Sequence, residues 1–184
     1  MRQVWSAERQ PGLAKRRIWF LDETGVNLSF SREYARSIRG SRALGNKPKN
    51  YGDSVTLLGA INENGTIAAL EVRGSTDETV ILAFIKEILS KVLSPGDCVV
   101  LDNLSSHKTN KVQKAFAALE VEVCYLPPYS PDLNPIEMCW SKIKTYLKQA
   151  AARNYRALSE AISKALKTIT AADAKNWLKH CGYV

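Results

Sequence analysis

The sequence has few of the side chains that build a zinc site or a disulfide-rich scaffold. It contains 2 histidines and 4 cysteines in 184 residues, and the cysteines are widely separated, with no Cys-x-x-Cys pair. Structural zinc sites and disulfide frameworks need closely spaced thiols or imidazoles. We therefore expect four free thiols that are buried as small hydrophobic side chains in a reducing compartment. These cysteines are Cys98, Cys124, Cys139 and Cys181.

The sequence also lacks long hydrophobic runs, internal repeats and low-complexity tracts. Its most apolar stretch, residues 79–89, contains Lys86 and Glu87 and is far shorter than the ~20 apolar residues of a membrane span. Residues 1–17 carry charges but no apolar segment of the kind found in a secretory signal. We therefore expect no membrane partner and a cytoplasmic location.

Acidic residues are outnumbered by basic ones. The 26 Lys and Arg residues against 18 Asp and Glu give a net charge of +8, while the 45% hydrophobic content is that of a globular domain. This balance excludes a disordered tail, a collagen-like fibre and a coiled-coil rod. A basic domain of this size favours a polyanionic partner, most often a nucleic acid, although many basic proteins bind none.

Hydrophobic patterning predicts five strands. Short apolar runs rich in β-formers are typical of buried strands, and Asn64-Gly65 between two such runs is typical of a hairpin turn. The expected strands are residues 17–21, 54–61, 66–72, 98–101 and 121–126.

Helical periodicity follows the hairpin and then alternates with the later strands. Thr76 is the expected N-cap of the first helix. Strands alternating with helices after an opening hairpin predict an α/β fold, with a mixed five-stranded sheet and helices on both faces. This order is the one found in the ribonuclease-H-like fold. The expected helices are residues 76–92, 109–119, 135–150 and 158–169.

We expect a polar lead-in at residues 1–16 and a single domain at residues 17–184. A basic loop at residues 24–53 is inserted between the first and second strands. Loops of this length inside compact domains are usually functional or disordered, and we favour contact with DNA or a partner subunit over simple solvation. Within residues 32–49, six basic residues against the single acid Glu33 support this interpretation. They are Arg32, Arg36, Arg39, Arg42, Lys47 and Lys49.

Three acidic residues are placed where they could act together. Asp22 and Asp102 follow buried strands, and sites in α/β sheets form beyond the carboxyl ends of strands. Carboxylates there could share Mg²⁺ ions. Glu137 lies in the first turn of the helix at residues 135–150. Each residue also has a structural explanation: strand-end aspartates are often loop or cap residues, and Glu137 could be the acid of a capping box begun by Asn134.

Three segments carry a family resemblance. Residues 20–25 (FLDETG), 100–108 (VLDNLSSHK) and 125–137 (YLPPYSPDLNPIE) resemble the signature blocks of DDE transposases. The sequence is most similar to the bacterial insertion-sequence branch of the mariner-type superfamily. The resemblance implies a ribonuclease-H-like catalytic core in which Asp22, Asp102 and Glu137 are the catalytic residues and hold two Mg²⁺ or Mn²⁺ ions.

Two further residues of the second block, Asn103 and His107, are expected near the metal ions. Their role could be to support the ligands, and His107 is equally well explained as an ordinary residue at a helix N-terminus. Glu23, Asp53 and Asp132 are not expected to be ligands. Glu23 should point to the opposite side of the strand from Asp22, and Asp132 is typical of a turn.

The resemblance implies a transposase that cleaves double-stranded DNA at the ends of a mobile element and joins the 3′-OH to target DNA. It also implies a homodimer in the active complex and a location at the bacterial nucleoid. Relatives usually carry an N-terminal helix-turn-helix, for which the residues before the first strand leave no room, so we expect a separate DNA-reading domain or protein. The alternatives are a nuclease that only hydrolyses DNA, and an inactive DNA-binding or assembly module derived from a transposase.

The helix expected at residues 135–150 has one apolar face and one mixed polar stripe. Glu137, Lys144 and Lys148 fall along the stripe, which places two lysines on the same side as the candidate metal ligand. DNA binding and a plain solvated face explain this stripe equally well. The apolar face consists of Ile136, Trp140, Ile143 and Leu147.

Overall fold

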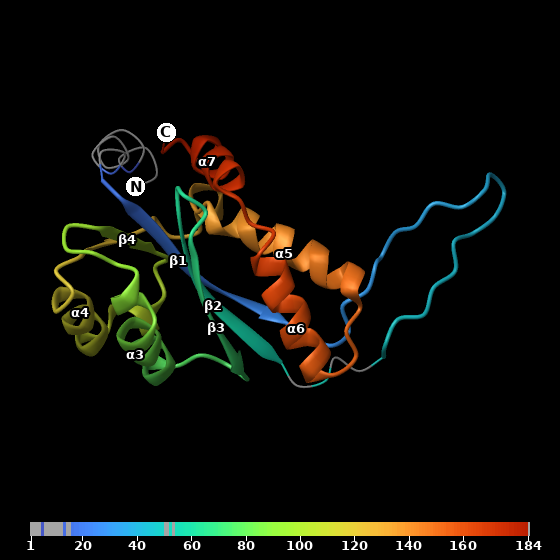
Figure 1. The fold of residues 1–184 in the computed structure, drawn as a ribbon, viewed down its shortest axis with the longest axis horizontal. Helices are drawn as coiled ribbons and strands as arrows, with labels where there is room; N and C mark the ends of the chain where they lie inside the picture. The colour runs from blue at the N-terminus through green and yellow to red at the C-terminus, as the bar shows by residue number, and fades with distance from the viewer. Residues whose placement is uncertain (1–4, 6–12, 14–15, 50–51, 53, 184) are drawn as a thin grey trace.

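The computed structural model describes residues 5, 13, 16–49, 52 and 54–183. A five-stranded mixed sheet forms the centre, with strand order β3-β2-β1-β4-β5 (Figure 1). The neighbours β1, β4 and β5 are parallel, whereas β2 is antiparallel to both β1 and β3. The strands are β1 (Ile18–Val26), β2 (Val55–Asn62), β3 (Ile67–Arg73), β4 (Cys98–Leu101) and β5 (Glu122–Tyr125).

The expected hairpin is confirmed, and β1 is longer than expected. Gly65, with a φ of 73°, provides the left-handed residue of the turn between β2 and β3. β1 continues to Val26 because β2 pairs with it over its whole second half, up to the pair Val26 and Val55. The prediction that the basic loop begins at residue 24 is therefore wrong by three residues, which belong to the strand.

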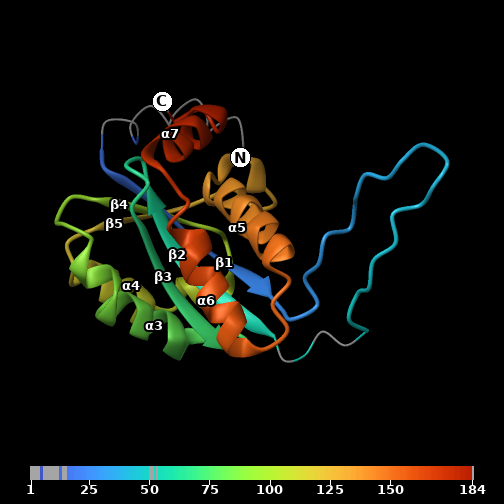
Figure 2. The same cartoon turned by 45° about the vertical axis from the view of Figure 1, so that its right-hand side comes forward.

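Helices cover both faces of the sheet, as predicted. α3 (Glu78–Glu87) and α4 (Asn110–Ala117) pack on one face, and α5 (Ile136–Ala150), α6 (Tyr155–Leu166) and α7 (Ala171–His180) pack on the other (Figure 2). Alternate residues of β1 point to opposite faces. Phe20 belongs to the core beneath α5, whereas Trp19 and Leu21 belong to the core beneath α3 and α4.

Several helix boundaries differ from the predicted ones because capping side chains, which short patterns do not identify, set the ends. Asp77 rather than Thr76 caps α3, accepting a hydrogen bond from the Val80 N–H. Asn154 starts α6 at Tyr155, three residues earlier than expected. The structure adds α7, which was not predicted and which begins with a true capping box between Thr170 and Asp173.

Other expectations concerned the cysteines and the N-terminal residues. All four cysteines are buried thiols outside any disulfide, as predicted. Trp5 and Leu13 of the expected lead-in are buried in the core beneath α5, while most of residues 1–16 and Asp53 lie outside the described residues. Across the described part of the chain, no helix is long and apolar enough to cross a membrane.

The chain between β1 and β2 forms an arm that projects away from the body of the molecule (Figures 1 and 2). Its described residues from 32 to 47 are exposed. Arg153 anchors its base by donating hydrogen bonds to the carbonyl oxygens of Leu28 and Phe30. The arm also exposes three large hydrophobic side chains, Tyr34, Ile38 and Leu44, which are 91%, 84% and 92% exposed.

Candidate active site

Asp22 and Asp102 are brought together by the register of two parallel strands. The last pair of the β1–β4 ladder is Leu21 and Leu101, so Asp22 continues β1 and Asp102 is the first residue after β4. Asp22 was expected to end its strand, but it lies in the middle of β1, opposite Gly59 of β2. Asp22 still borders the site because the adjacent strand β4 ends at Leu101, although β1 itself continues to Val26.

Glu137 reaches the same site from the start of α5. Pro135 is the N-cap residue, and no side chain caps this helix. The capping-box interpretation is therefore wrong: Asn134 accepts a hydrogen bond from the Glu137 N–H through its backbone carbonyl, and the Glu137 side chain is exposed.

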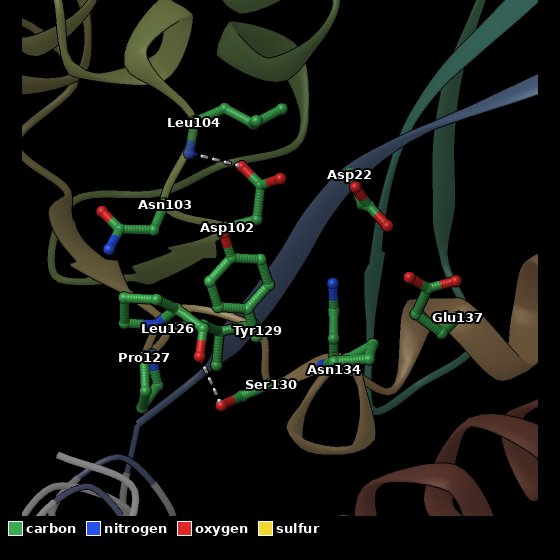
Figure 3. A pocket seen from close by; sticks show the side chains of 12 residues that line it. Asp22, Asp102, Asn103, Leu104, Leu126, Pro127, Tyr129, Ser130, Asn134 and Glu137 are labelled. Atoms are coloured by element: carbon green, nitrogen blue, oxygen red, sulfur yellow. Dashed lines mark hydrogen bonds between the residues drawn. The ribbon is translucent and has the colours of Figure 1, made fainter.

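The three carboxylates line one cavity of about 380 Å³. Figure 3 shows Asp22 between Asp102 and Glu137, with the Asn134 side chain pointing into the same space. The proline-rich segment at residues 126–131 forms another wall, and Asn103 also lines the cavity. The structure thus brings together four of the five residues expected in or near the site, from three separate parts of the chain.

Burial and like charge dominate the electrostatics of Asp22. This side chain is only 9% exposed. Burial, with repulsion from the nearby Glu137 and Asp102 carboxylates, raises the pKa of Asp22 to about 7. An ionised Asp22 is therefore costly unless a cation enters the cavity.

His107, the fifth expected residue, lies fully buried behind Asp102. Its Nδ1 is 2.7 Å from Oδ1 of Asp102, and its Nε2 is 3.3 Å from Oε1 of Glu23. Thr76 donates a hydrogen bond of 2.6 Å to the other Glu23 oxygen. Glu23 points away from Asp22, as expected, and the structure assigns it a role that the sequence did not reveal: it holds the far side of His107.

Charge compensation sets the pKa values of this buried network. Burial opposes the charged form of His107, but the two carboxylates outweigh it and raise its pKa to about 9. The hydrogen bond from His107 lowers the pKa of Glu23. Burial also opposes ionisation of Asp102, yet hydrogen bonds from His107 and the Leu104 N–H lower its pKa. At neutral pH the network is an imidazolium between two carboxylates.

The chemistry of the donors fits a hard divalent cation. Carboxylate oxygens are the ligands preferred by Mg²⁺ and Mn²⁺. A cation in the cavity would stabilise the ionised form of Asp22, which burial and the two neighbouring acids disfavour. Among the described residues, no three His, Cys, Asp or Glu side chains already stand close enough to hold an ion.

A basic groove of about 310 Å³ lies where the arm meets α5. Lys47 of the arm and Lys144 and Lys148 of α5 line it together, while Arg32 and Lys148 line a smaller neighbouring hollow. Lys144 is seven residues beyond Glu137, which places it roughly 10 Å farther along the helix axis. Glu33 lies 3.7 Å from Lys47 and 3.9 Å from Lys148.

The other basic residues of the arm are not part of this groove. They extend along the exposed arm, away from the carboxylates. They are Arg36, Arg39, Arg42 and Lys49.

Most of the chain matches the model of one known family. The family model described as DDE superfamily endonuclease matches residues 17–159. The chain belongs to the DDE superfamily endonucleases. All three carboxylates of the cavity lie within the matched residues, as do the basic groove and the buried His107 network. Comparison with curated proteins gave no match.

Solved structures similar to this DDE endonuclease include a Mos1 strand transfer complex, with 16% identity, a TM-score of 0.79, and 98% of this chain and 57% of that chain covered. A Mos1 mariner paired-end complex with Mn has 16% identity, a TM-score of 0.78, and coverages of 98% and 58%. The catalytic domain of Mos1 mariner transposase has 14% identity, a TM-score of 0.65, and coverages of 95% and 87%. This likeness confirms the ribonuclease-H-like fold. The chain spans less than two thirds of the longer Mos1 chains.

Proposed function

We propose that residues 17–184 form the catalytic domain of a mariner-type transposase, which cleaves DNA at the ends of a mobile element and joins the freed 3′-OH to target DNA. The observation that carries the proposal is the single cavity lined by Asp22, Asp102 and Glu137. These acids occupy the three signature blocks and lie inside the family match. The likeness to a strand transfer complex supports joining as well as cleavage.

In this proposal, Asp22, Asp102 and Glu137 hold two Mg²⁺ or Mn²⁺ ions. When bound, such ions activate the attacking oxygen and stabilise the leaving oxygen of an in-line displacement at phosphorus. Complexes of Mos1 are known with Mn and with Mg, which supports the choice of ion. Asp22 supplies the most buried ligand, while the exposed Glu137 approaches from α5.

His107 and Asn103 support the ligands in different ways. His107 keeps Asp102 ionised and fixes its Oδ1 through a 2.7 Å hydrogen bond, as outer groups commonly orient metal ligands. Asn103 lines the cavity beside Asp102, where its amide can contact a phosphate or a bound water.

The basic groove is the proposed path of the DNA backbone away from the cavity. Lys47, Lys144 and Lys148 converge there from two segments, and phosphate contacts by such residues give affinity without sequence preference. The arm, with Arg36, Arg39 and Arg42, extends this surface. Its exposed apolar side chains suit contact with a second copy in a homodimer. A separate helix-turn-helix domain or protein would supply recognition of the element ends.

The decisive experiment compares cleavage and joining by the parent chain and by Asp102→Asn, using supercoiled DNA and a 3′-OH oligonucleotide with Mg²⁺ or Mn²⁺. We expect both products from the parent, neither from the variant, and an unchanged circular dichroism spectrum. Cleavage without joined product would favour the hydrolytic nuclease. Full activity of the variant would refute the assignment of the site.

A further inference from the structure

Trp140 is the buried side chain that connects the helix of Glu137 to the strand of Asp22. It is 1% exposed, and it lies three residues after Glu137, on the neighbouring face of α5. Its indole N–H is buried and makes no hydrogen bond of regular geometry to the described residues, although it lies close enough to Asp22 to lower the pKa of that carboxyl. Burying such a donor without an acceptor destabilises the folded protein, so this N–H calls for an explanation.

The indole lies beside Asp22 because it packs against a glycine of the sheet. Gly59 is the cross-strand partner of Asp22. A Cβ atom at Gly59 would lie 2.5 Å from Cη2 of Trp140, a distance that no packed structure tolerates. The absence of a side chain at Gly59 therefore makes room for the end of the indole ring against β2, beside Asp22. In this position the indole N–H favours the ionised carboxylate and offsets part of the rise in the Asp22 pKa.

We propose that Trp140 is a positioning residue for the first carboxylate of the site: its N–H donates a hydrogen bond to Asp22 once the carboxylate is drawn to a cation. The inference rests on the proposed function, since it takes Asp22 to be a metal ligand. The same contact sets the separation between β1 and α5, and thereby the separation between Asp22 and Glu137.

Trp19 shows how the same fold treats a buried indole with a purely structural partner. It is also 1% exposed, but its N–H donates to Oδ2 of Asp97 at 3.2 Å, on the opposite face of the sheet. The buried Trp5 indole N–H also has no acceptor among the described residues, so the position beside Asp22 is what distinguishes Trp140. Trp19 is therefore a matched control for the removal of a buried indole N–H.

The test compares Trp140→Phe, Trp19→Phe and Asp22→Asn in the full chain, with Mn²⁺ affinity measured by calorimetry and free Mn²⁺ by electron paramagnetic resonance. Removing a hydrogen bond to a charged group should weaken Mn²⁺ binding by Trp140→Phe roughly tenfold. Trp19→Phe should bind Mn²⁺ as the parent does, and Asp22→Asn should lose the site. Cleavage by Trp140→Phe should recover at higher Mn²⁺ concentration, which a general packing defect would not allow.

The outcomes separate the inference from the proposed function. Loss of Mn²⁺ binding in Asp22→Asn with parental affinity in Trp140→Phe would overturn the role of Trp140 and leave the site standing. Unchanged binding in Asp22→Asn would refute the site itself. If Trp140→Phe does not fold, the indole N–H resonance of Trp140 in the ¹⁵N-labelled parent decides: a downfield shift on Mg²⁺ saturation supports the hydrogen bond, and an unmoved resonance overturns it.

Discussion

The imidazole Nδ1 of His107 lies 2.7 Å from the Oδ1 atom of Asp102. This contact links a residue with no exposed surface to a wall of the cavity. Because Glu23 holds the other side of the ring, the imidazolium is enclosed by two carboxylates. The orientation of Asp102 and the stability of the fold therefore both depend on His107 being protonated.

His107 should make stability depend on pH. Its folded-state pKa of about 9 lies above the ordinary value of 6.5, so its stabilisation is complete below about pH 6.5 and is lost as pH rises through 9. His107→Ala should lower the free energy of unfolding at pH 6 by roughly 2–3 kcal/mol, since it leaves two partly buried carboxylates unpaired. Chemical denaturation at pH 6, 8 and 10 measures both effects. The exposed His180 provides the control variant, His180→Ala, which should leave the free energy of unfolding at pH 6 nearly unchanged.

Asp22 should destabilise the metal-free protein as pH rises from about 4 to 7. Its folded-state pKa of about 7 exceeds the ordinary 3.8, so the folded state binds more protons in that window and loses stability with rising pH. Asp22→Asn should remove this dependence and be more stable than the parent at pH 8, by roughly 2–4 kcal/mol. Mg²⁺ should raise the melting temperature of the parent more at pH 8 than at pH 6. An equal Mg²⁺ effect on parent and variant would contradict Asp22 as a ligand.

Glu137→Gln should leave the stability of the metal-free protein nearly unchanged, because the Glu137 side chain does not cap α5. Removal of its charge should instead reduce Mg²⁺-dependent cleavage by two orders of magnitude or more, about 3 kcal/mol of transition-state stabilisation. Thermal melting and single-turnover cleavage assays measure the two properties. Glu87→Gln, an exposed change of the same charge on α3, should affect neither. Loss of stability with cleavage retained would mean that another residue is the third ligand.

DNA binding should show little sequence preference, and its affinity should fall steeply as the salt concentration rises. The double variant Lys144→Ala with Lys148→Ala should reduce the slope of log affinity against log salt by about 1–2, as expected for the loss of one or two phosphate contacts. Fluorescence anisotropy with a random duplex measures the slope. Lys175 and Lys179 are also four residues apart, on α7, and are exposed; their double alanine variant should keep the parental slope.

The arm should contribute separately to that slope. Replacing Arg36, Arg39 and Arg42 with alanine should flatten the salt dependence if the arm follows the DNA backbone. An unchanged slope would confine the phosphate contacts to the groove with Lys144 and Lys148. Glu33→Gln should tighten binding, because Glu33 lies near two groove lysines and repels a phosphate.

The sequence by itself determined which acids were candidates and which elements carry them. Periodicity located α5 and its apolar face, and the Asn-Gly turn located the hairpin, because both signals depend on residues a few positions apart. The same local information predicted a capping box at Glu137 that does not form. It also placed Asp22 at a strand end, because no local pattern reveals that β2 extends β1 beyond β4.

Only the tertiary structure decided how distant residues complete the site. The pairing of Leu21 with Leu101 sets Asp22 beside Asp102, and the enclosure of His107 by Glu23 and Asp102 joins segments 84 and 5 residues away along the chain. The packing of Trp140 on Gly59 likewise could not be predicted from the sequence around either residue. Such contacts depend on register and on the packing of a helix against a sheet, which are settled by the burial of the whole core rather than by any short segment.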